Sequence, residues 1–138
     1  MRTSPAMPLL FSALLSALLL TGCRGGMETG DPAYDLDVVI SPTPPAVGPA
    51  RLIITLDDSA GAPVEGAQIV VEGNMSHAGM VPVLDTAEVE GPGLYGISDF
   101  TFTMAGDWIL TLEATLPDGR RVQTSAATNV VGRIGGGR

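Results

Sequence analysis

Residues 108–115 have the sequence WILTLEAT, and this stretch decides the fold. Its apolar and polar side chains alternate, with Trp108, Leu110, Leu112 and Ala114 on one side and Ile109, Thr111, Glu113 and Thr115 on the other. Alternation with a period of two predicts a β-strand that has one buried face. Trp108 is the only tryptophan in the chain, and we expect it at the centre of the core.

Six further segments of the chain have strand composition. They are residues 35–41, 51–57, 64–72, 83–90, 94–102 and 120–131. Turn formers separate them, including DSAGAP at 58–63, GPG at 91–93 and PDG at 117–119. Short strands spaced about 8–12 residues apart are typical of a β-sandwich. We therefore predict an all-β, immunoglobulin-like antiparallel β-sandwich of about seven strands over residues 35–132, with an open barrel as the alternative.

Two of these strands also show which side chains face inward. In residues 64–72, the apolar side chains Ala67, Ile69 and Val71 share one face. In residues 94–102, Tyr95, Ile97 and Asp99 share one face, and Leu94, Ser98, Phe100 and Phe102 share the other. Residues 74–82 (NMSHAGMVP) have no strand period, and we expect a loop there.

The amino-terminal residues 1–22 have the pattern of a signal peptide. Arg2 precedes the apolar run LLFSALLSALLL at 9–20, which is shorter than the about 20 residues needed to span a bilayer. The sequence LTGC at 20–23 resembles the lipobox of bacterial lipoproteins, so we expect Cys23 to be lipidated and to become the first residue of the mature protein. The alternatives are a secretory signal with a chance cysteine and an uncleaved anchor.

This processing places the protein in the cell envelope. Cys23 is the only cysteine and cannot form an internal disulfide. We expect residues 23–34 to form a Gly-rich flexible tether and the Gly-rich tail at 133–138 to be disordered. Arg24 follows the cysteine, which by resemblance to enteric lipoproteins favours the outer membrane, facing the periplasm, if the organism has one.

The charge of the chain bears on its partners. Removal of residues 1–22 leaves all 15 acidic residues and six of the seven arginines, so the net charge changes from −8 to −9. Such a charge repels phosphate backbones and excludes nucleic acid as a partner. It suits cationic ligands, or it serves solubility alone.

One loop gathers side chains that bind soft metals. Met75, His77 and Met80 lie within six residues, and Met104 joins them if two loops meet at one end of the sandwich. Thioether sulfur and imidazole suit Cu(I), which would then be the cofactor. Alternatively, Met75, Met80 and Met104 fill the core and His77 faces solvent.

Three blocks of sequence resemble one family of extracytoplasmic domains. They are DSAGAPVEGA at 58–67, GNMSHAGMVP at 73–82, and GLYG at 93–96 followed by FTMAGDW at 102–108. In this order they are similar to the YtkA-like domain, which is related to the FixH family. The resemblance implies a small β-domain associated with copper handling, oxidase assembly or metal efflux. FixH-type proteins usually carry a transmembrane helix, whereas this chain has a lipobox.

No pattern in the chain indicates catalysis. Ser76 and His77 are immediate neighbours, so their side chains diverge in an extended loop, and no phosphate-binding or metalloprotease motif is present. We expect a protein that is not an enzyme and has no catalytic residues. Two functions remain open: a lipid-anchored binding protein for Cu(I) or oxidase assembly, and a structural module that binds another envelope protein without a metal.

Overall fold

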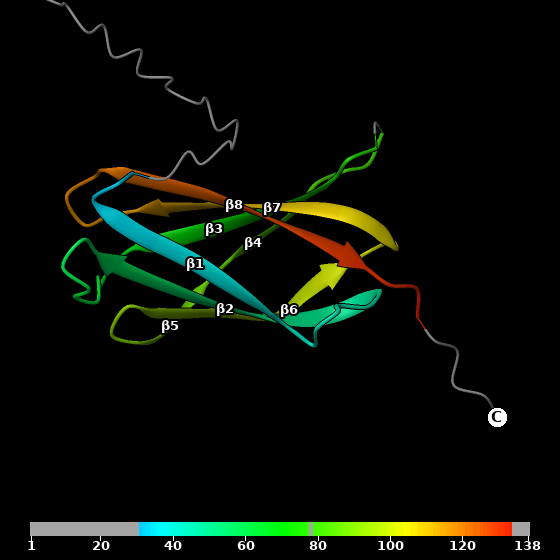
Figure 1. Ribbon diagram of the computed structural model, residues 1–138, viewed down its shortest axis with the longest axis horizontal. Helices are drawn as coiled ribbons and strands as arrows, with labels where there is room; N and C mark the ends of the chain where they lie inside the picture. The colour runs from blue at the N-terminus through cyan, green and yellow to red at the C-terminus, as the bar shows by residue number, and fades with distance from the viewer. Residues whose placement is uncertain (1–30, 78, 134–138) are drawn as a thin grey trace, which may run out of the picture.

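Two antiparallel sheets of four strands make up this domain (Figure 1). The computed structural model describes residues 31–133 except Ala78. Within them the strands are β1 (Tyr34–Ser41), β2 (Gly48–Asp58), β3 (Gln68–Met75), β4 (Val83–Thr86), β5 (Glu88–Gly91), β6 (Leu94–Phe102), β7 (Gly106–Thr115) and β8 (Arg121–Val130). The order is β1-β2-β6-β5 in one sheet and β4-β3-β7-β8 in the other.

This strand order is the immunoglobulin arrangement. One sheet holds the first, second, fifth and sixth strands, and the other holds the third, fourth, seventh and eighth. The predicted all-β, immunoglobulin-like sandwich is therefore confirmed. The structure has one strand more than the expected seven, because residues 83–90 form two strands instead of one.

Those two short strands belong to different sheets. Thr86 at the end of β4 pairs with Val70 of β3, whereas Glu88 at the start of β5 pairs with Gly96 of β6. Ala87 lies between them, and its N–H donates to the carbonyl of Ile69 at 2.9 Å. The prediction of one continuous strand was therefore wrong. The chain changes sheet at Ala87 while its side chains keep almost the same alternation, so the sequence pattern did not reveal the break.

Strand β3 is displaced along the sequence from its predicted position. It begins at Gln68 and continues to Met75, so Asn74 and Met75 lie in the strand and not in the loop. Both residues pair with β7, Asn74 with Ile109 and Met75 with Trp108. The predicted buried face is correct, because Ala67, Ile69 and Val71 are all buried.

The predicted faces of β6 are wrong in its second half. Tyr95, Ile97, Phe100 and Phe102 are all buried, although the last two were assigned to the opposite face. The register of β6 with β2 shifts between Ala50 and Leu52. Such an irregularity reverses the side-chain alternation beyond it, and strict periodicity cannot anticipate this.

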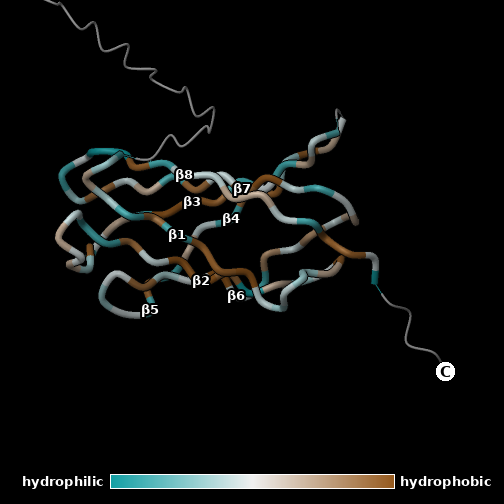
Figure 2. The backbone as a smooth tube through the Cα atoms, in the orientation of Figure 1, coloured by the Kyte–Doolittle hydropathy of each residue, from teal (hydrophilic) through white to brown (hydrophobic). Residues whose placement is uncertain are grey.

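The core lies between the two sheets and is apolar. Trp108 is 1% exposed, as predicted, and its ring packs edge-on against Phe102 with the ring centroids 5.2 Å apart. Figure 2 shows hydrophobic residues along the strands that enclose this interior. Every core residue lies between Leu36 and Val130. Residues 24–138 therefore include the whole of this core.

Several predictions concern residues outside the described part of the chain. The signal peptide, Cys23, most of the tether and the last five residues of the tail all lie there. Strand β1 starts at Tyr34, one residue before the predicted domain boundary. In the described residues, no helix combines the length and apolarity that crossing a membrane requires.

Candidate functional site

The candidate metal ligands lie at the end of the sandwich where β3 finishes and β7 begins. Figure 1 shows the loop between β3 and β4 projecting from this end, which also carries the turn between β6 and β7. Antiparallel pairing of β3 with β7 brings them together, because Met75 at the end of β3 is the partner of Trp108 near the start of β7. One further bond extends the pairing, from the N–H of Ser76 to the carbonyl of Asp107 at 3.3 Å.

Met75 lies against the turn that carries Met104. A Cβ atom built on Gly106 would be 2.8 Å from the terminal methyl carbon of Met75. Gly106 has a φ of +132°, a conformation that side chains rarely adopt. The absence of a side chain at residue 106 therefore leaves the space that the Met75 thioether group occupies.

Trp108 fixes the backbone of the same turn. Its indole Nε1–H donates to the carbonyl of Met104 at 3.0 Å, so the turn is bonded to the largest residue of the core. The side chain of Met104 is 51% exposed. This thioether, exposed on an anchored turn, is available to a ligand. The alternative expectation that Met104 fills the core does not agree with its exposure.

The remaining candidates differ in their burial. Met75 and Met80 are partly buried and pack against the core, whereas His77 is exposed. The structure thus places Met75 and Met104 at one end of the sandwich and puts Met80 and His77 in the adjoining loop. The sequence did not identify Gly106 and Trp108 as positioning residues, although both stand in the block FTMAGDW.

Other metal chemistry has no comparable group of ligands. Within residues 31–133, Ala78 apart, no three His, Cys, Asp or Glu side chains are grouped so that they could hold a metal ion. A site at the Met75 end would therefore depend on thioether sulfur with His77 as the only imidazole. Such a donor set suits Cu(I) and not a hard divalent cation.

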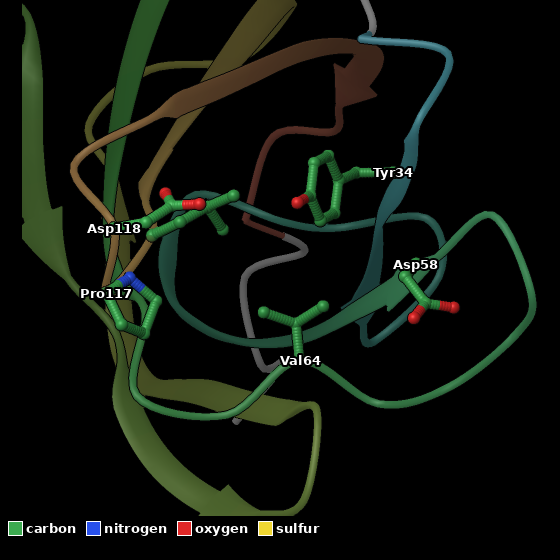
Figure 3. Close-up of a pocket in the computed structure, with 6 residues that line it drawn as sticks. Tyr34, Asp58, Val64, Pro117 and Asp118 are labelled. Atoms are coloured by element: carbon green, nitrogen blue, oxygen red, sulfur yellow. The ribbon is translucent and has the colours of Figure 1, made fainter.

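A pocket lies at the end of the domain opposite to Met75. Its lining, most of which Figure 3 labels, consists of Tyr34, Asp58, Val64, Leu116, Pro117 and Asp118. The carboxylate of Asp58 accepts hydrogen bonds from the backbone of its own turn, at Ala60 and Ala62. The carboxylate of Asp118 accepts bonds from Arg120. Both carboxylates therefore accept hydrogen bonds from their own turns, and we assign no ligand to this pocket.

Comparison with known proteins identifies the family. The sequence model described as YtkA-like matches residues 31–113, which is more than half of the chain and includes β1 to most of β7. The chain belongs to the YtkA-like family. All three blocks that resembled this family, from residue 58 to residue 108, lie within the match. A comparison with curated proteins gives no match.

Two solved structures resemble this YtkA-like domain. CopC from Methylosinus trichosporium OB3b has 16% sequence identity and a TM-score of 0.47, and the alignment covers 72% of this chain and 96% of CopC. Murine CRIg has 16% identity and a TM-score of 0.42, with 72% of this chain and 98% of CRIg covered.

Proposed function

We propose that this YtkA-like protein is an extracytoplasmic, lipid-anchored binding protein whose Met75 end binds Cu(I), in copper handling or oxidase assembly. The observation that carries the proposal is the position of Met75 and Met104. Met75 packs against Gly106, and Met104 stands exposed two residues before that glycine, on a separate segment of the chain. Met80 and His77 stand in the adjoining loop as further ligands.

The proposal assigns different roles to the four side chains. Met75 is held by the β3–β7 pairing and by its contact with Gly106, so it gives the site a fixed position. Met104 and His77 are exposed and can approach a metal from the solvent side. The lipid on Cys23 keeps the domain at the membrane surface, and the role is binding instead of catalysis.

A competitive Cu(I) titration of residues 24–138 tests this function. The variants are Met75→Leu, Met80→Leu, Met104→Leu and His77→Ala, singly and combined. Leucine preserves the apolar volume but removes the sulfur, so the core stays filled. Met27→Leu is the matched control, because Met27 is the only other methionine in residues 24–138. We expect the combined variant to lose Cu(I) binding and the control to retain it.

The second function is a structural or protein-interaction module without a metal. Its supporting observation is that Met75 and Met80 pack against the core, as methionines that only close the end of a sandwich would. In that case the combined variant binds Cu(I) as weakly as the wild type does. Capture of one reproducible partner from crosslinked envelopes by both proteins would then support this second function.

A further inference from the structure

Four strands of this domain lie at sheet edges, and three of them carry features that prevent pairing with another chain. β4 and β5 have only four residues each, and β5 also carries two glutamates and a register shift. β1 carries Asp35 and Asp37. Short length, charge and irregular register are the usual protections of an edge strand.

β8 is long, regular in register and free of acidic residues, although β1 of the other sheet lies near it. It is ten residues long, and all ten pair with β7 without a register shift. Among the eight strands of the described residues, it is the only one without an acidic residue, in a chain that has 15 of them. Its single charged residue is Arg121, and it contains no proline. Figure 1 shows β8 as an outer strand of its sheet.

The hydrogen-bond phase shows which residues of β8 face outward. The N–H of Leu116 bonds to the carbonyl of Arg120, its partner in the register. Because hydrogen-bonded pairs alternate along an antiparallel ladder, the even-numbered residues of β8 bond to β7. The N–H and C=O groups of the odd-numbered residues from Arg121 to Asn129 therefore point away from β7, to an edge that no other strand of the described residues pairs with. Val131 continues this phase, because it bonds from the free side to Pro45 and Val47.

We propose that two copies of this chain pair through their β8 edges and form one continuous eight-stranded sheet. A two-fold axis requires antiparallel pairing of identical strands. Val131 already bonds to Pro45 and Val47, so the edge available for pairing ends at Asn129. If every outward-facing residue from Arg121 to Asn129 is used, the two-fold axis passes through the midpoint of this segment, which is Ser125. Ser125 of one copy then stands opposite Ser125 of the other.

Charge complementarity supports this register. Arg121, whose guanidinium lies 3.6 Å from the Glu113 carboxylate on its own β7, stands opposite Asn129 of the other copy. The Asn129 amide donates to the carboxylate of Asp107 at 2.7 Å. With strands about 4.8 Å apart, Asp107 is two strands away from Arg121 and within reach of its long side chain. The symmetry generates this attraction twice. The rest of the edge consists of small, uncharged side chains at residues 123, 125 and 127.

Sedimentation equilibrium of residues 24–138 over a range of concentrations tests the dimer. An edge contact is smaller than a standard interface of about 1,600 Å², so dimer and monomer should both be measurable. We expect Ser125→Lys and Arg121→Glu each to raise the dimer Kd by about tenfold or more, because a carboxylate at 121 faces Asp107 and a lysine at 125 faces its own copy. Thr55→Lys, exposed on the other sheet, should leave the Kd unchanged.

A disulfide experiment fixes the register independently. Residues 24–138 contain no cysteine, so Ser125→Cys introduces a single thiol. Directly opposite Cα atoms in a hydrogen-bonded pair are about 5.5 Å apart, a distance that a disulfide spans. We expect Ser125→Cys to crosslink rapidly into dimers and Ser59→Cys, in the β2–β3 loop, to do so only slowly. A wild type that is monomeric at every concentration, or equal crosslinking of the two variants, would overturn the proposal.

Discussion

The terminal methyl of Met75 occupies the space in which Gly106 would carry a side chain. A Cβ at residue 106 would be 2.8 Å from the Met75 Cε atom, closer than real side chains approach. The contact joins the last residue of β3 to the first residue of β7. This contact places the Met75 thioether next to the turn that carries Met104. The candidate site therefore depends on Gly106, although a glycine has no side chain that could bind a metal.

Substitution of Gly106 by alanine should therefore disturb both stability and the position of Met75. We expect Gly106→Ala to reduce the free energy of unfolding by about 1–3 kcal/mol, from backbone strain at a φ of +132° together with the contact. Urea unfolding of residues 24–138 measures the loss. In a Met75→Ala background the same substitution should cost less, because the contact is gone. Equal losses in both backgrounds would contradict the role of Met75.

A second glycine supports the core from within β3. A Cβ on Gly73 would be 2.7 Å from Cζ of Phe100 and 3.3 Å from Cδ2 of Leu110. Gly73→Ala forces these side chains apart, and we expect a loss of about 1–3 kcal/mol in the free energy of unfolding. Gly132→Ala is the control, since nothing lies within 4 Å of that position and its effect should stay within about 0.5 kcal/mol.

The alternation of side chains predicted much of this fold. β7 and the faces of β3 followed from it, because the interior of one sheet selects every second residue. It could not predict the change of sheet at Ala87 or the irregular pairing of β6, since both depend on a neighbouring strand and not on local sequence. For the site, composition identified Met75, His77, Met80 and Met104. The contact with Gly106 required knowledge of the strand register.

Among the residues that the structure describes, Tyr95 is the one buried core side chain with a hydroxyl group, and it should contribute to stability through that group. Its O–H donates to the carbonyl of Val64 at 2.8 Å, and its oxygen accepts from the N–H of Ala67 at 3.1 Å. Tyr95→Phe leaves a buried N–H without its partner, which costs about 1–3 kcal/mol. Thermal or urea unfolding measures this loss. Tyr34→Phe is the comparison, because Tyr34 is only partly buried, and an equal loss there would contradict the prediction.

Asp118 should titrate below the usual range of aspartate. The backbone N–H of Arg120 is the largest cause of its lowered pKa, and the Arg120 side chain adds to the effect. A carboxyl whose pKa is lowered by folding stabilises the folded state above its unfolded pKa of 3.8 and loses this contribution as the pH falls through the folded value. The loss therefore lies in the acid range, below about pH 4.

An NMR titration of the Asp118 carboxyl in the wild type and in Arg120→Gln checks this prediction. The substitution removes the guanidinium but keeps the backbone N–H of residue 120. We expect the pKa of Asp118 to rise part of the way towards its ordinary value and to remain below it. A full return to the ordinary value would show that the side chain, and not the backbone bond, is the main cause.

Trp108 should report on metal binding at the candidate site. Its indole N–H is bonded to the carbonyl of Met104, and its backbone pairs with Met75, so a metal ion held by these thioethers would lie close to the ring. Because it is the only tryptophan, the whole indole emission comes from this position. Cu(I) is redox-active and should quench an excited indole at such a short distance.

We expect the emission of residues 24–138 to fall as Cu(I) is added, and to fall equally in the Met27→Leu control. In a variant that combines Met75→Leu and Met104→Leu the emission should stay constant, whereas quenching of all three proteins to the same extent would place the metal elsewhere.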